Sequence, residues 1–128
     1  MVHSATRTIL IVEDDQHIRK LLNILIRRDD VVIDEAVEGL EARQKLLDNH
    51  YDLVILDLMM PHVDGFSLLK EMREREETAQ VPVIIVSARS EDRDLMKGYS
   101  MGANYYITKP FEPHDLIHSV ELILKIKY

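Results

Sequence analysis

The sequence contains no cysteine, which excludes a disulfide framework, a thiolate nucleophile and a cysteine metal site. It has no apolar run near the roughly 18 residues that cross a bilayer. Residues 1–6 lack the apolar segment of a signal peptide, so we interpret them as a short disordered leader and expect a cytoplasmic protein. No linker or repeat divides the remainder, which predicts one domain over residues 7–128.

Positive charge is also in short supply, because 16 basic residues face 23 acidic ones and leave a net charge of −7. This balance argues against nucleic acid or an anionic membrane surface as a direct partner. The six histidines are scattered without the spacing of a zinc site. The carboxylates are therefore the candidate functional groups of this chain.

Short apolar runs alternate with segments of helical period along the whole chain. Strands are predicted at about residues 8–12, 31–36, 53–57, 83–86 and 104–108. Helices are predicted at about 16–28, 39–49, from 64 to about 72, 92–101 and from Pro113 onward. Strand–helix alternation repeated five times predicts right-handed crossovers and an α/β fold.

The first, third and fourth runs are wholly apolar, as in strands covered on both faces, whereas the second and fifth are mixed in polarity. We therefore expect a doubly wound (βα)5 three-layer sandwich, with a five-stranded parallel sheet in the order 2-1-3-4-5. Sites in such folds lie beyond the carboxyl ends of the strands, near the switch between the first and third.

Three details of the helices are also expected. Arg27 and Arg28 suit the negative end of the first helix dipole. The second helix presents Leu40, Leu46 and Leu47 as its apolar side, and the charged segment 73–80 is the solvated end of a helix, for which a function is not expected.

Polar groups follow the three central strands and the fifth strand, and parallel strands bring their carboxyl ends to one edge. The residues concerned are Glu13, Asp14, Asp15, Asp57, Ser87 and Lys109. Neighbouring carboxylates repel, and a hard divalent cation such as Mg²⁺ can hold them ionised. With a lysine as phosphate binder and a serine hydroxyl as donor, these parts describe an aspartyl-phosphate site on Asp57. Taken singly, each has a simpler interpretation, such as a helix-start acidic run for residues 13–15.

At this point the chain resembles the receiver domains of two-component response regulators, a flavodoxin-like family of the CheY type. The matching segments are residues 9–15 (ILIVEDD), 52–61 (DLVILDLMMP), 81–88 (VPVIIVSA) and 102–111 (GANYYITKPF). Their order and spacing extend the resemblance over about residues 7–125.

The resemblance implies that Asp57 accepts a phosphoryl group from the phosphohistidine of a histidine kinase or a histidine phosphotransfer protein, with Mg²⁺ as cofactor. It implies metal ligation by Asp14, by Asp57, by the Met59 carbonyl and, through water, by Glu13. The role of Asp15 is left open.

The resemblance further implies that Ser87 and Lys109 hold the phosphate and that the Lys109–Pro110 bond is cis. Tyr106 corresponds to the switch aromatic, which follows Ser87 and alters the face of the fourth helix, fifth strand and last helix. That face would control an output domain or partner protein, or form a homodimer. The protein would assist its own phosphorylation and dephosphorylation without being a turnover enzyme.

Three other functions are alternatives to an aspartyl-phosphate switch. A phosphohydrolase of the haloacid-dehalogenase type needs a second Asp where Met59 stands. An FMN carrier needs a Ser/Thr/Gly-rich loop after the first strand, where this chain has three acids. An interaction module that works without phosphorylation remains open to assay.

Overall fold

The computed structural model describes residues 6–128 and contains a five-stranded parallel sheet with five helices. The predicted leader over residues 1–6 lies almost wholly outside the described residues. The strands are β1 (Arg7–Val12), β2 (Val31–Ala36), β3 (Leu53–Leu56), β4 (Val83–Ser87) and β5 (Tyr105–Thr108). The helices are α1 (Gln16–Ile26), α2 (Gly39–Asp48), α3 (Gly65–Glu74), α4 (Asp92–Ser100) and α5 (Pro113–Leu124).

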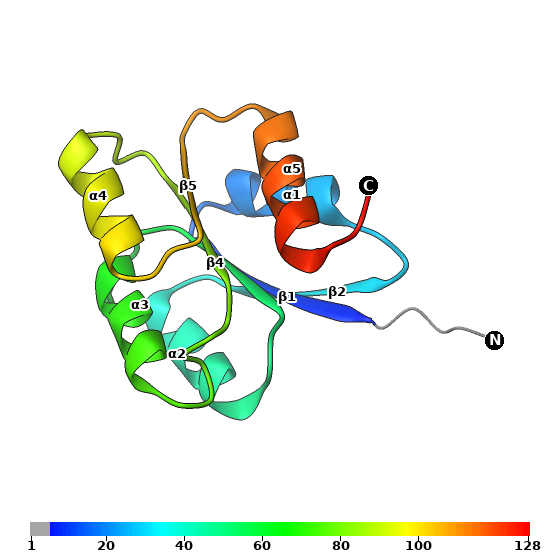
Figure 1. Ribbon diagram of the computed structural model, residues 1–128. Helices are drawn as coiled ribbons and strands as arrows, with labels where there is room; N and C mark the ends of the chain where they lie inside the picture. The colour runs from blue at the N-terminus through cyan, green and yellow to red at the C-terminus, as the bar shows by residue number, and fades with distance from the viewer. Residues whose placement is uncertain (1–5) are drawn as a thin grey trace.

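The strands lie in the order β2-β1-β3-β4-β5, and every neighbouring pair is parallel, which confirms the predicted fold. Helices α1 and α5 cover one face of the sheet, while α2, α3 and α4 cover the other (Figure 1). The predicted edges are correct, since β2 and β5 are the outermost strands. No helix in the described part of the chain is long and apolar enough to cross a membrane.

The central strands are buried on both faces, which explains their continuous apolar sequences. In β1, Leu10 and Val12 belong to the core beneath α2 and α3, whereas Ile9 and Ile11 belong to the core beneath α1 and α5. Successive side chains of a strand point to opposite faces, so a strand between two helical layers needs apolar residues at every position. This sandwich fixes where the carboxyl ends of the strands emerge.

The prediction for the end of α1 was wrong in detail. Helix α1 ends at Ile26, and Arg27 is already extended, so neither arginine lies in its last turn. The guanidinium of Arg28 instead forms an ion pair with Asp30 at 2.8 Å and lies over the ring of Tyr128. Arg28 therefore interacts with Asp30 and Tyr128 beyond the end of the helix, and not with the helix dipole as predicted.

The apolar side of α2 also differs from the prediction. Leu46 is buried, but Leu40 and Leu47 are each almost half exposed, and the core contact comes from Ala42 instead.

The segment 73–80 is more than a solvated helix end. Thr78 is buried, and its hydroxyl donates to the Met72 carbonyl at 2.7 Å. The Arg73 guanidinium donates to the carbonyls of Thr78, Ala79 and Gly102. Arg73 thereby ties the end of α3 to the turn that follows α4, so part of the segment predicted to be solvated is packed against the fold.

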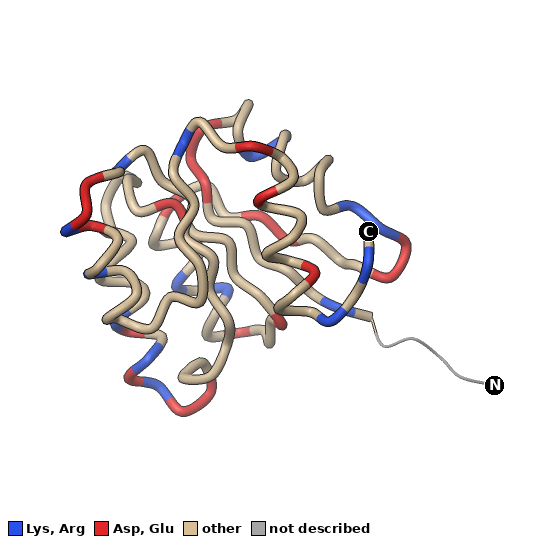
Figure 2. The backbone as a smooth tube through the Cα atoms, turned by 45° about the horizontal axis from the view of Figure 1, so that its top comes forward, with Lys and Arg blue, Asp and Glu red and all other residues tan. Residues whose placement is uncertain are grey.

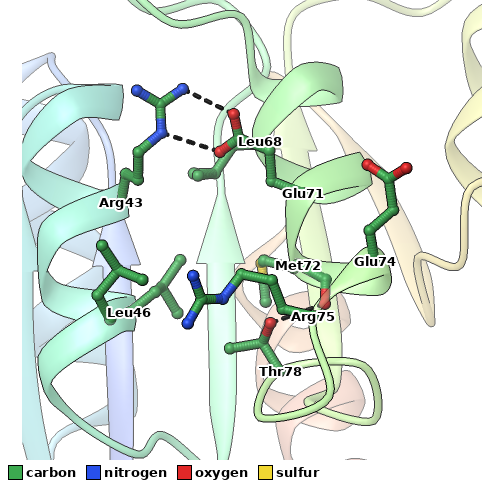
Figure 3. Close-up of a pocket in the computed structure, with 9 residues that line it drawn as sticks. Arg43, Leu46, Leu68, Glu71, Met72, Glu74, Arg75 and Thr78 are labelled. Carbon is green, nitrogen blue, oxygen red and sulfur yellow. Dashed lines mark hydrogen bonds and ion pairs between the residues drawn. The ribbon is translucent and has the colours of Figure 1, made fainter.

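An ion pair joins α2 to α3 above a shallow apolar groove. Arg43 donates two hydrogen bonds to the Glu71 carboxylate, at 2.8 and 2.9 Å, and Leu46, Leu68 and Met72 lie beside the pair (Figure 3). Both charged side chains are about 40% exposed, so water screens their attraction. The two hydrogen bonds therefore orient α2 relative to α3 more than they stabilise the fold.

Asp34 on β2 organises the edge of the sheet. Its carboxylate accepts hydrogen bonds from the Lys45 ammonium and the Tyr51 hydroxyl, each at 2.6 Å. Burial raises the pKa of Asp34, but these hydrogen bonds and that from the Glu35 N–H outweigh it, so the pKa lies below its ordinary value of 3.8. Asp34 thereby joins β2 to α2 and to the residue that precedes β3 by two positions.

Replacing Asp34 by Asn should lower the free energy of unfolding at pH 7 by about 0.2 to 1 kcal/mol, since the ion pair is partly exposed. Because the folded pKa is depressed, the contribution of Asp34 is complete above its unfolded pKa and is lost as the pH falls through the folded value. Urea unfolding from pH 7 down to pH 3 should therefore show the two proteins converging in acid. Asp29→Asn, at an exposed loop position, is the control, and an Asp34→Asn difference that stays constant over this range would contradict the account.

Candidate functional site

The site is built around Asp57, the first residue after β3. The Asp57 N–H donates to the Val12 carbonyl at 3.0 Å, which continues the pairing of β3 with β1 and fixes the residue at the carboxyl edge of the sheet. Its side chain is 5% exposed, and one carboxylate oxygen accepts the Met59 N–H at 3.1 Å. One oxygen of the carboxylate is therefore held by the backbone at the edge of the core, and the second oxygen is left for another partner.

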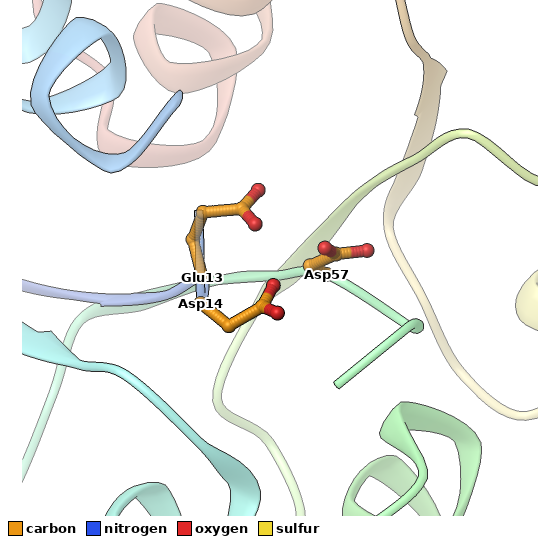
Figure 4. Close-up of side chains that lie close together, drawn as sticks. All are labelled: Glu13, Asp14 and Asp57. Atoms are coloured by element: carbon orange, nitrogen blue, oxygen red, sulfur yellow. The ribbon is translucent and has the colours of Figure 1, made fainter. Parts of the chain in front are cut away.

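Three carboxylates meet at this edge. Glu13, Asp14 and Asp57 each offer an oxygen atom, and these atoms lie within 4.8 Å of one another (Figure 4). Glu13 is 1% exposed, whereas Asp14 is open to solvent. Like charges so close repel, and an all-oxygen set with one open side is chemically suited to a hard divalent cation. The donor set thus fits Mg²⁺.

Lys109 supplies the positive charge of the site. Its ammonium group lies 2.7 Å from a Glu13 oxygen and 3.2 Å from the second oxygen of Asp57. The Lys109 N–H donates to the Ser87 carbonyl at 2.8 Å, and the bond to Pro110 is cis, as the resemblance implied. Sequence reasoning brought Lys109 to Asp57 but did not anticipate that Glu13 would be its nearer partner.

The protonation of these groups follows from their burial and contacts. Burial raises the pKa of Glu13 to about 7, because the Lys109 hydrogen bond offsets desolvation and the nearby Asp57 charge only in part. Burial lowers the pKa of Lys109, but the hydrogen bond to Glu13 and the charge of Asp57 outweigh it, so the pKa lies above 10.5. Lys109 is therefore fully charged at neutral pH.

Asp15 has a different task from its two acidic neighbours. Its side chain accepts hydrogen bonds from the backbone N–H groups of His17 and Ile18 at 2.8 and 3.0 Å, which makes it the N-cap of α1. These bonds hold the pKa of Asp15 below its ordinary value. The question left open by the sequence is settled by this geometry: Asp15 starts the helix.

Ser87 and Tyr106 are joined through Arg89, a residue that sequence reasoning missed. Ser87 is fully buried, and its hydroxyl accepts the Arg89 N–H at 3.1 Å. The Tyr106 hydroxyl donates to the Arg89 carbonyl at 2.8 Å. Burial raises the pKa of Tyr106, so this hydroxyl stays protonated and able to donate. The backbone of Arg89, in the loop between β4 and α4, therefore bonds to both residues.

Met59 is placed beside the site by its backbone rather than by its side chain. Met59 is 53% exposed, while Met60 packs on the core beneath α2 and α3. The two residues and Asp14 line a shallow depression next to Asp57 that opens to solvent.

The fold and this edge define an α/β domain with an acidic, metal-compatible pocket and one lysine at the carboxyl ends of its parallel strands. A family model described as "Response regulator receiver domain" matches residues 9–121. The chain belongs to this family, whose members are signalling switches of two-component systems.

The sequence is similar to that of curated bacterial regulators. It is 39% identical over 117 residues to the transcriptional regulatory protein ResD of Bacillus subtilis (strain 168), and 37% identical to SrrA of Staphylococcus aureus (strain NCTC 8325 / PS 47). The match covers 91% of this chain but 48% and 47% of those proteins. The chain therefore spans about half the length of the curated relatives it matches.

Solved structures agree over nearly the whole chain. The receiver domain of Francisella response regulator 1452 aligns with a TM-score of 0.86 and 32% identity, covering 94% of this chain and 98% of that one. A putative response regulator from Chloroflexus aurantiacus aligns with a TM-score of 0.87 and 33% identity, covering 94% and 99%. The resemblance noted in the sequence is confirmed.

A double-mutant cycle should measure the coupling of Lys109 to Glu13. With Lys109→Met and Glu13→Gln, we expect an interaction free energy of about 1 to 3 kcal/mol in urea unfolding at pH 8, because the pair is buried and a single change strands its partner.

The matched control is the pair formed by Glu91 and Arg93, whose 2.8 Å separation is nearly the same but whose side chains are 65% and 82% exposed. Its cycle, with Glu91→Gln and Arg93→Met, should give less than about 1 kcal/mol. Equal coupling in the two cycles would show that burial does not strengthen the Lys109 pair.

Proposed function

We propose that this domain is a phosphorylation-controlled switch in which Asp57 receives a phosphoryl group from the phosphohistidine of a histidine kinase or histidine phosphotransfer protein. The observation that carries the proposal is the position of Asp57 between a lysine ammonium 3.2 Å away and two further carboxylates. A buried acid beside a cation and a metal-compatible cluster has the parts needed to accept phosphate.

In the transfer, an Asp57 oxygen attacks phosphorus, an O–P bond forms and the N–P bond to the donor imidazole breaks. The charge on the phosphoryl oxygens would be offset by Lys109, and the Ser87 hydroxyl would donate a hydrogen bond to one of them. In a separate hydrolysis step, water attacks phosphorus, the O–P bond to Asp57 breaks, and inorganic phosphate leaves as the carboxylate is restored. The domain assists both steps, but the group that is modified is its own Asp57. It therefore acts as a switch rather than as a turnover enzyme.

The cofactor proposed for these steps is Mg²⁺. Asp14 and Asp57 would bind it directly, Glu13 through water and Met59 through its backbone carbonyl. When bound, the ion neutralises charge on the carboxylates and on the phosphoryl oxygens. The close approach of three carboxylates around a single lysine supports this assignment, because their mutual repulsion is otherwise only partly offset.

The signal would leave through Ser87 and Tyr106. A phosphoryl group that attracts the Ser87 hydroxyl takes it from the Arg89 N–H, and the Tyr106 ring can then enter the space that Ser87 leaves. Tyr106 lies on β5 against α4, so its movement alters the face made by α4, β5 and α5. This face would then control an output domain or partner protein, with a homodimer as one form of contact.

We further propose a cytoplasmic protein whose receiver domain binds neither nucleic acid nor membrane directly. The net charge of −7 supports this, as does the interspersion of acidic and basic positions around the described chain (Figure 2). The names of ResD and SrrA, which describe them as transcriptional regulatory proteins, are compatible with an output domain that binds DNA in a longer chain.

Intact-mass measurement after incubation with Mg²⁺ and acetyl phosphate tests the proposal. We expect one phosphoryl adduct, labile to hydroxylamine as an acyl phosphate is, because Asp57 is the acid that the site presents to the donor. Asp57→Asn should remove the adduct, and so should omission of Mg²⁺.

Asp64→Asn is the matched control, since Asp64 precedes α3 outside the carboxylate cluster and should leave the adduct intact. An adduct of equal extent in Asp57→Asn would refute the phosphoacceptor assignment. Absence of any adduct from acetyl phosphate and from phosphohistidine donors alike would favour the module that works without phosphorylation.

A further inference from the structure

Helix α4 contacts the backbone of Tyr106 as well as its ring. The Tyr99 hydroxyl accepts a hydrogen bond from the Tyr106 N–H at 3.1 Å. Because β5 is an edge strand, N–H groups directed away from β4 have no strand partner, and the Tyr99 hydroxyl fills that place for Tyr106. The side chain of Tyr99 is itself 48% exposed, so the contact lies at the surface of the domain.

Gly98, the preceding residue of α4, makes room for the Tyr106 ring. A Cβ atom at this position would lie 2.9 Å from Cδ2 of Tyr106 and 3.0 Å from Cδ1 of Ile85. Glycine inside a helix costs about 0.5 to 1 kcal/mol relative to alanine, so its presence here has a packing reason. The buried position of the ring, which is 8% exposed, depends on the missing side chain.

The far end of Tyr106 is fixed through Arg89. The Tyr106 hydroxyl donates to the Arg89 carbonyl, and the Arg89 guanidinium lies 5.8 Å from the centre of the Phe66 ring and 4.0 Å from Asp94 of α4. The Lys97 ammonium, also from α4, lies 4.4 Å from the same ring centre. Helix α4 therefore holds both the switch residue and the loop to which it is bonded.

We propose that Gly98 and Tyr99 are positioning residues that hold Tyr106 in the position seen here and thereby set how readily the domain is phosphorylated. The inference rests on the proposed function of Asp57. Any movement of β5 against α4 must give up the Tyr99 bond, so this contact favours the present state over the switched one. By linkage, a change that weakens the present state favours phosphorylation to the same degree.

Tyr99→Phe removes the acceptor while keeping the ring. We expect the Tyr106 amide to exchange its hydrogen about fivefold faster, as for the loss of one net hydrogen bond, and the initial rate of phosphorylation by acetyl phosphate to rise by up to the same factor. The measurements are amide hydrogen exchange by NMR on the unmodified protein and intact mass over time.

Tyr105→Phe is the matched control, because Tyr105 packs toward the opposite layer, against the core beneath α1 and α5. It should change neither measurement. A second variant, Gly98→Ala, should displace the Tyr106 ring and raise the phosphorylation rate by a different route, whereas Ser100→Ala on the same helix should not. Far-UV circular dichroism and urea midpoints establish that each variant is folded.

Unchanged exchange and phosphorylation in Tyr99→Phe would overturn the inference, and so would faster exchange with an unchanged phosphorylation rate. A wild-type protein that accepts no phosphoryl group refutes the proposed function itself, and the inference falls with it. Failure of the positioning role alone is recognised by normal phosphorylation of the wild type together with indifference to Tyr99→Phe and Gly98→Ala.

Discussion

The interaction on which the site depends is the contact of the Lys109 ammonium with Glu13 and Asp57. These three residues follow β5, β1 and β3, so a single cation joins the carboxyl ends of an edge strand and two central strands. Without it, two buried carboxylates would face each other across a short gap. The same charge is the one proposed to meet the phosphoryl group, so the resting contact and the chemistry use one side chain.

The sheet makes this contact possible because its apolar central strands are buried and hold their carboxyl ends in place. Strands β1, β3 and β4 are covered on both faces, and the polar residues begin at the point where each strand leaves the core. This arrangement was predictable, since unbroken apolar runs and helical periods each have one simple physical interpretation. The strand order and the convergence of Glu13, Asp14 and Asp57 with Lys109 followed from the same reasoning.

What escaped prediction depends on contacts between segments far apart in the sequence. The periodicity of α2 did not show that Leu40 and Leu47 stay exposed, and no local pattern linked Arg73 to Gly102. Arg89 bonds to Ser87 and Tyr106 through its backbone atoms, which any residue type possesses. Tyr99 accepts a hydrogen bond from an edge strand, a contact that became visible only once α4 and β5 were placed side by side.

The measurement that tests the account most directly is a ¹H–¹⁵N NMR spectrum of the protein with Mg²⁺ and beryllofluoride, a stable mimic of the phosphoryl group. The account predicts shifts at Asp57, Ser87 and Lys109 together with shifts along α4 and β5, including the Tyr106 amide. Binding whose shifts stay within the loops around Asp57 would contradict the claim that the acidic pocket controls the α4–β5–α5 face.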